Sequence, residues 1–212
     1  MKKESERILD ELIARYPALG YERNNILGAF LIIYQSYCNG NKLLLCGNGG
    51  SAADCEHIAG ELMKCFRKKR PVNEEFSLKL RSFGEEGRLL SEKLEKALPA
   101  IALTDQIALS TAIANDIGQN FIFAQRLYGI ARSGDVLLAI STSGNSQNCV
   151  YAALTAKAAG LKVIALTGAA DSRLSGVADV TVRVPETETY KVQELHLPVY
   201  HCLCAMLEEE LF

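Results

Sequence analysis

Four hydroxyl side chains and a glycine stand together in the hexapeptide Ser141–Ser146, which reads STSGNS. An apolar run at 136–140 precedes the hexapeptide, and an alanine-rich helical pattern follows it. This order predicts a strand that ends at the hexapeptide and a helix that begins there. The first turn of a helix has unpaired N–H groups and the positive end of the helix dipole, so it attracts anions. The hexapeptide therefore indicates a phosphate-binding loop, with Ser141, Thr142, Ser143 and Ser146 as its hydroxyl groups.

A second turn of the same kind, GNGGS at 47–51, follows the apolar run at 42–46. Glycine permits positive φ and close approach of the backbone, and Ser51 stands where a helix N-cap belongs. Neither turn contains a P-loop or a usable GxGxxG pattern, which favours a single phosphate on a small molecule over a nucleotide. In an open α/β sheet, ligands bind at the carboxyl ends of the strands. Asn48, Gly49 and Ser51 are therefore candidate binding residues.

All three histidines of the chain lie in two helical patterns that also carry acids and amides. His57 and Glu61 are four residues apart, so they share one face of a helix. Gln193 and His201 are eight apart and share a face of the C-terminal pattern, whereas His196 lies off that line. Such a set can bind a divalent metal or transfer protons beside a carbonyl. The spacing also fits a surface ion pair and a core histidine, so it leaves these alternatives open.

The bulk composition narrows the class of protein. The chain has 212 residues, of which 49% are hydrophobic and 23% charged, as expected for one globular domain. A net charge of −2 argues against a general nucleic-acid binder. No apolar run is long enough to cross a bilayer, and the first residues lack the apolar core of a signal peptide. Seven cysteines without a CxxC pair argue against a disulfide framework, so we expect a reducing, cytoplasmic location.

Short apolar runs alternate with helical patterns along most of the chain. This alternation predicts a doubly wound α/β sandwich with a five-stranded parallel sheet flanked by helices. The expected strands are Lys42–Cys46, Ala100–Leu103, Val136–Ile140, Lys162–Leu166 and Asp179–Val184. The expected helices are Lys2–Arg15, Glu22–Asn39, Ser51–Phe66, Ser146–Ala159 and Tyr190–Leu211, the last with Pro198 interrupting its pattern.

One charged segment, Val72–Leu98, breaks this alternation and has Gly84 and Gly87 in its middle. The segment predicts an inserted helical hairpin, either a lid over the top of the sheet or a solvated excursion. We therefore expect a single domain over 1–212, with N-terminal helices in 1–40 and an insertion at about 72–98.

These motifs together resemble the sugar isomerase (SIS) domain of phosphoheptose isomerases. The resemblance runs from about residue 5 to the C-terminus, apart from the insertion. The hexapeptide is shared by sugar-phosphate-binding SIS proteins generally, and the set of His57, Glu61, Gln193 and His201 is more specific to the heptose enzymes. The segments that carry the resemblance are GNGGSAAD at 47–54, PAIAL at 99–103, Asn115-Asp116, GDVLL at 134–138, STSGNS at 141–146 and QELH at 193–196.

The resemblance implies a homotetramer with active sites at subunit interfaces. It implies zinc bound by His57, Glu61, Gln193 and His201, and a sugar phosphate held by Ser51 and the hydroxyl groups of the hexapeptide, with Asp116 on substrate hydroxyls. The implied reaction interconverts sedoheptulose 7-phosphate and glycero-manno-heptose 7-phosphate for the precursors of surface glycans. Glu61 would be the base and His201 its partner acid and base.

The sequence departs from the family pattern at three places. Cys65 stands where an arginine usually follows the catalytic glutamate by four residues, and Thr189-Tyr190 stands where an acidic residue often precedes the glutamine-bearing helix. The insertion is mostly absent from the compact enzymes. We expect a phosphosugar aldose–ketose isomerase; the alternatives are isomerisation of another sugar phosphate, or a non-catalytic SIS module that binds sugar phosphates or a protein partner.

Overall fold

The computed structural model describes residues 1–212 and contains one five-stranded sheet with the order β2-β1-β3-β4-β5. Every pair of neighbouring strands is parallel. The strands are β1 (Leu43–Gly47), β2 (Ala100–Ala102), β3 (Val136–Ile140), β4 (Lys162–Thr167) and β5 (Val180–Arg183). The predicted five-stranded parallel α/β sheet is therefore confirmed. The chain reverses its winding between β1 and β3, and such a switch point is where open α/β sheets bind ligands.

The central strands are buried on both faces, which explains their continuous apolar sequences. All residues of β1 and β3 are buried. Alternate side chains of these strands enter two separate cores: Leu45 and Leu138 face one core, while Leu44 and Leu137 face the other. This alternation follows from the period of two in a strand, and it requires helices on both sides of the sheet.

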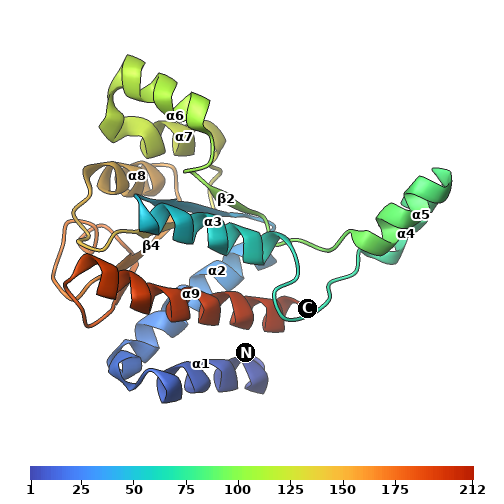
Figure 1. Ribbon diagram of the computed structural model, residues 1–212, viewed down its shortest axis with the longest axis horizontal. Helices are drawn as coiled ribbons and strands as arrows, with labels where there is room; N and C mark the ends of the chain where they lie inside the picture. The colour runs from blue at the N-terminus through green and yellow to red at the C-terminus, as the bar shows by residue number, and fades with distance from the viewer.

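Those helices form the outer layers of the sandwich (Figure 1). The helices that pack on the first face of the sheet are α2 (Arg23–Cys38), α3 (Gly50–Met63) and α9 (Thr189–Leu211), and α1 (Lys3–Arg15) packs outside α9. The second face is covered by α7 (Ile122–Ile130) and α8 (Gln147–Ala158). The remaining elements of the body are η1 (Pro17–Glu22), α6 (Ile107–Ile113), η2 (Ala114–Gly118) and η3 (Gln119–Phe121).

Three details differ from the sequence expectations. Helix α3 ends at Met63 rather than Phe66, because Lys64 is extended. Helix α9 continues through Pro198 without interruption. The stretch from α6 to α7 is helical, although no expected element covers it. None of the helices is long and apolar enough to span a membrane.

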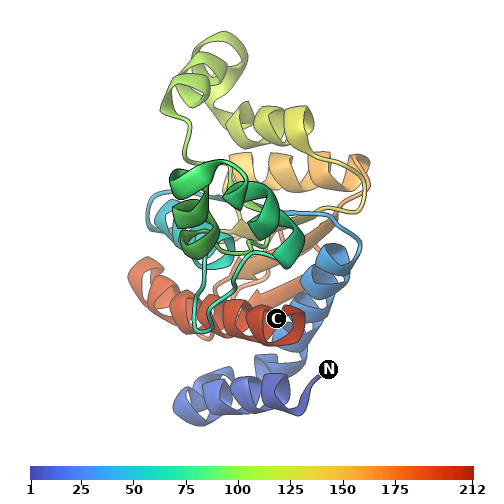
Figure 2. The same ribbon diagram turned by 90° about the vertical axis from the view of Figure 1, so that its right-hand side faces the viewer.

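The insertion folds as two helices, α4 (Glu74–Arg81) and α5 (Gly84–Lys93). Asn73 begins α4 as an N-cap, since its side chain accepts a hydrogen bond from the Phe76 N–H at 2.8 Å. The two helices pack on each other and extend away from the body, so they do not form a lid over the sheet (Figures 1 and 2). We refer to α4 and α5 as the inserted hairpin.

Candidate active site

A pocket of about 280 Å³ lies where three helices begin at the carboxyl edge of the sheet. It opens beside the ends of β1 and β3. Ser51 lines it from the start of α3, Ser146 precedes α8, and Thr189 begins α9. Three helix N-termini directed at one small polar pocket favour a dianionic ligand. The pocket is also lined by Asn48, Gly49, Ser141, Thr142 and Gln193. We refer to it as the phosphate pocket, after the class of ligand that its helix N-termini favour.

Two glycines in the first turn are required by its geometry. Gly49 precedes α3 with φ 55° and ψ −121°, a conformation that glycine adopts far more easily than other residues. A Cβ atom on Gly50 would lie 2.5 Å from Nε2 of Gln193. The bare backbone of Gly50 therefore lets Gln193 of α9 approach the start of α3.

The two turns are also tied to each other. The side-chain amides of Asn48 and Asn148 exchange hydrogen bonds of 2.9 and 2.8 Å, so the β1–α3 turn is joined to the first turn of α8. Within the hexapeptide, the Ser141 hydroxyl donates to Oγ of Ser146 at 3.1 Å. Ser143 is exposed, and its Oγ accepts a hydrogen bond from the Asn145 N–H. Ser143 thus shapes the loop, and it does not line the pocket.

A second group of side chains meets farther along α3 and α9. Nε2 of His57 lies 3.2 Å from Oε1 of Glu61 and 3.5 Å from Nε2 of His201. Burial and the neighbouring His57 lower the pKa of His201 below its usual value. The neutral form of His201 is therefore favoured, and it can accept or donate a proton.

The donor set of this group suits zinc. Ligand atoms about 2.1 Å from a tetrahedral zinc ion lie about 3.4 Å from each other, close to the two separations found here. Nitrogen and oxygen lone pairs that face one another also repel unless a proton or a cation lies between them. In this structure no group of three or more His, Cys, Asp or Glu side chains is placed so that it could hold a metal ion. Gln193 lines the phosphate pocket, two turns of α9 before His201.

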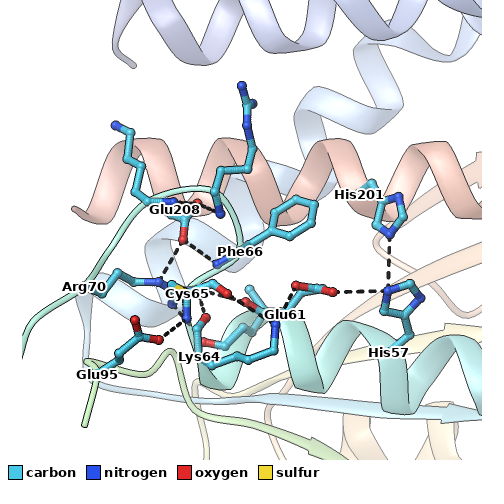
Figure 3. A network of polar contacts seen from close by, with 12 residues as sticks. His57, Glu61, Lys64, Cys65, Phe66, Arg70, Glu95, His201 and Glu208 are labelled. Atoms are coloured by element: carbon cyan, nitrogen blue, oxygen red, sulfur yellow. Dashed lines mark hydrogen bonds and ion pairs between the residues drawn. The ribbon is translucent and has the colours of Figure 1, made fainter. Parts of the chain in front are cut away.

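A buried ion pair fixes the end of α3 next to these side chains (Figure 3). Nε of Arg70 lies 2.9 Å from Oε1 of Glu208, and both side chains are at most 2% exposed. The Arg70 guanidinium also donates to the carbonyl oxygens of Glu61, Leu62 and Lys64. Four carbonyl groups at the end of a helix lack partners within it. Arg70 satisfies three carbonyls in this region and so caps the helix that carries His57 and Glu61.

Besides its ion pair with Arg70, the Glu208 carboxylate of α9 accepts hydrogen bonds from three backbone N–H groups. They come from Phe66, Arg67 and Lys68, at 2.9, 2.7 and 3.1 Å. This binding fixes the segment after α3, and it places the Phe66 ring 5.6 Å from the ring of His201. The charges of Arg70 and Glu208 gave no signal in the sequence, because their partners are mostly backbone groups.

Cys65 is tied to the base of the inserted hairpin. Its N–H donates to Oε2 of Glu95 at 2.7 Å, and the Glu95 carboxylate raises the pKa of the Cys65 thiol. Lys64, the preceding residue, places its ammonium 3.2 Å from Oε2 of Glu61. The Glu61 carboxylate therefore lies between two basic groups, the His57 imidazole at Oε1 and the Lys64 ammonium at Oε2.

Asp116 lies apart from both groups in this structure. It is exposed on η2, accepts a hydrogen bond from the Asn115 amide at 2.8 Å, and does not line the phosphate pocket. Two residues beside the site that the sequence did not single out are Asn148, which is hydrogen-bonded to Asn48 of the pocket, and Tyr200, whose hydroxyl lies 3.0 Å from Nδ1 of His57. Thr189, noted in the sequence only as a departure from the family pattern, lines the pocket.

Comparison with known proteins first identifies the domain class of this chain and then its family. The sequence matches the SIS domain over residues 9–97 and 90–168. Phosphoheptose isomerase of Nitratiruptor sp. is 38% identical over 187 residues, which cover 88% of this chain and 87% of that protein. Phosphoheptose isomerase of Aneurinibacillus thermoaerophilus is 38% identical over 176 residues, 83% and 76% of the two chains. The structure of phosphoheptose isomerase from Neisseria gonorrhoeae gives a TM-score of 0.74 at 31% identity, covering 97% of this chain and 94% of that one. The chain belongs to the phosphoheptose isomerase family of SIS-domain proteins.

Proposed function

We propose that this protein interconverts sedoheptulose 7-phosphate and glycero-manno-heptose 7-phosphate. The observation that carries the proposal is that α3 and α9 pack on each other and each carries residues of both groups. Helix α3 brings Ser51 to the phosphate pocket and Glu61 to the acid–base group, while α9 brings Gln193 and His201 to the same two places. A sugar phosphate anchored at one end would present its carbonyl end to Glu61 and His201.

The reaction moves one proton between neighbouring carbons. In the direction of the aldose, the Glu61 carboxylate removes a proton from C1 of the ketose, and the electron pair forms an enediolate. The same proton, or one exchanged with solvent, is returned to C2. His201 transfers a proton between O1 and O2, so that O2 becomes a hydroxyl and O1 becomes the aldehyde oxygen. No atom is lost, as an isomerisation requires.

We propose that zinc is bound by His57, Glu61, Gln193 and His201; the side chains of His57, Glu61 and His201 meet in this structure, and Gln193 lies two turns of α9 before His201. Bound zinc would polarise the substrate carbonyl and stabilise the negative charge that develops on oxygen. The imidazole and carboxylate donors and their separations support this assignment.

The test is to supply purified protein with sedoheptulose 7-phosphate and zinc in D₂O and to follow the aldose by NMR. We expect the aldose to form with deuterium at C2, because the transferred proton exchanges with solvent. Glu61→Gln should abolish turnover and retain binding of inorganic phosphate, which uses the other end of the site. Absence of turnover by the wild-type protein with zinc present would refute the substrate assignment.

Related substrates should also be tested, because the inserted hairpin and Cys65 depart from the family pattern. The segment after α3 differs from the family pattern next to the acid–base group, so the sugar-reading end of the site is where specificity would change. A panel of five- to seven-carbon ketose phosphates should show the highest kcat/KM with the seven-carbon sugar. A higher value for a shorter sugar would reassign the substrate and keep the isomerase.

We also propose a homotetramer in the cytoplasm. Large apolar side chains exposed on α6, α7 and the inserted hairpin support association; examples are Phe83 and Ile107, each 78% exposed. All seven cysteines are free thiols, which fits a reducing compartment. Light scattering should give four times the mass of the 23.1 kDa chain, and a monomer would contradict the assembly.

A further inference from the structure

We infer that Tyr200 is a positioning residue that presents the Nε2 lone pair of His57 to the acid–base group, and this inference rests on the function proposed above. Tyr200 belongs to α9 and is 1% exposed. Its hydroxyl lies 3.0 Å from Nδ1 of His57 and 3.2 Å from Oδ1 of Asp54. The phenol therefore bridges two residues of α3 that are three positions apart.

The direction of these hydrogen bonds follows from the groups themselves. A carboxylate only accepts hydrogen bonds, so the Tyr200 O–H donates to Asp54. The hydroxyl oxygen is then left to accept from Nδ1–H of His57. The Glu61 carboxylate, 3.2 Å from Nε2, is a competing acceptor for the ring proton, and the Tyr200 oxygen is the group that favours its place on Nδ1. With the proton on Nδ1, the neutral imidazole presents the Nε2 lone pair to Glu61 and His201.

Ring packing holds this arrangement in place. The Tyr200 ring meets the His57 ring edge to face, with centroids 5.5 Å apart, and meets the His201 ring in the same manner at 4.9 Å. A group that hydrogen-bonds the far nitrogen of a metal-binding histidine fixes its tautomer and orientation, and its loss typically lowers metal affinity about 10- to 100-fold. Tyr200 has the position of such a group, and nothing in its sequence context marks it.

The experiment compares wild type with Tyr200→Phe, which removes one oxygen atom and keeps the ring. The protein has three histidines, so nitrogen-15 NMR of the metal-free protein at pH 8 can assign the tautomer of each. We expect Nδ1–H at His57 in the wild type and a shift toward Nε2–H in Tyr200→Phe, where the Glu61 carboxylate is the remaining acceptor beside the ring. Affinity for cobalt(II), measured by its visible absorption, should fall about 10- to 100-fold, whereas affinity for inorganic phosphate should stay the same. In turnover, kcat should fall with little change in KM.

Two further variants make the result specific. Tyr37→Phe removes another hydroxyl that bonds the body of the protein, through the Pro99 carbonyl at 3.2 Å, and should leave the tautomer and cobalt affinity unchanged. Asp54→Asn gives Tyr200 an amide that can donate to it, which frees the phenol proton for Nδ1 of His57. Asp54→Asn should therefore move the His57 proton to Nε2, and it tests the same inference if Tyr200→Phe does not fold.

The outcomes separate the inference from the proposed function. An unchanged His57 tautomer in both variants, or unchanged cobalt affinity in a folded Tyr200→Phe protein, would overturn the role of Tyr200. A wild-type protein that binds neither cobalt nor zinc would refute the proposed metal. In that case the tautomer measurement still decides the inference: Nδ1–H in the wild type that is lost in Tyr200→Phe supports it, and any other result overturns it.

Discussion

Acidification between about pH 6.5 and pH 4 should destabilise this protein through one buried side chain, His196. The His196 ring is fully buried on α9, and neither ring nitrogen has a hydrogen-bond partner of normal geometry. Burial lowers the pKa of His196 to about 4, opposed only in part by the nearby Thr167 main chain. In the unfolded chain the same imidazole has a pKa of about 6.5.

The direction of the change in the free energy of unfolding follows from proton binding. Between these two pKa values the unfolded chain binds a proton at His196 and the native protein does not, so the free energy of unfolding falls as pH falls. The contribution is complete above about pH 6.5 and is lost progressively toward pH 4. At about 1.4 kcal/mol per pKa unit, the expected loss from His196 between pH 7 and pH 4.5 is about 2.4 kcal/mol.

The assay is urea unfolding of wild type and His196→Leu at pH 7 and pH 4.5. Circular dichroism is the suitable signal, because the chain has no tryptophan. Leucine fills a similar volume without a titratable group, so the variant should lose about 2.4 kcal/mol less than wild type over this range. His201 and the carboxylates titrate in both proteins, and their contributions cancel in the comparison. Equal losses in the two proteins would refute the reasoning.

Three other changes test the framework around the site. Glu208→Gln leaves Arg70 buried without its counter-ion and should lower the free energy of unfolding by about 3–5 kcal/mol; a loss in urea unfolding no larger than that of an exposed control, Lys79→Ala, would show that the pair does not hold α3. Gly50→Ala places a Cβ atom 2.5 Å from the end of the Gln193 side chain, so it should raise KM with little loss of stability, and an unchanged KM would count against Gln193 at the phosphate pocket. Gly87→Ala places a Cβ atom 1.8 Å from the Leu80 carbonyl oxygen and should separate α4 from α5; faster amide exchange confined to the inserted hairpin is expected, and unchanged protection would contradict it.

The sheet and the two loops at 47–51 and 141–146 that line the pocket could be predicted because their signals are local. The strands at 43–47 and 136–140 are buried on both faces, which leaves a continuous apolar run in the sequence. The loops that follow these strands carry glycine and hydroxyl residues, which mark tight turns and helix starts in a sequence. These are properties of neighbouring residues, and one sequence is enough to show them.

The parts that could not be predicted depend on partners far apart in the chain. Arg70 and Glu208 are 138 positions apart by their numbers, and each is bonded mainly to backbone groups that have no sequence signature. Tyr200 resembles any other aromatic residue of an apolar helix until its hydroxyl is seen beside His57. Helix α3 ends at Met63 for the same reason, since its cap is Arg70 rather than a glycine.

The inserted hairpin leaves and rejoins the body at a single place. Pro71 and Glu95 form an isolated antiparallel bridge, and the Lys96 N–H donates to the Arg70 carbonyl. Strands paired in this way can be joined by a two-residue turn such as Asn-Gly. We therefore expect that residues 72–94 can be replaced by such a turn without moving Arg70 or Glu95. The sandwich is complete without the inserted hairpin, so insertions of very different length could connect Pro71 and Glu95 in its place.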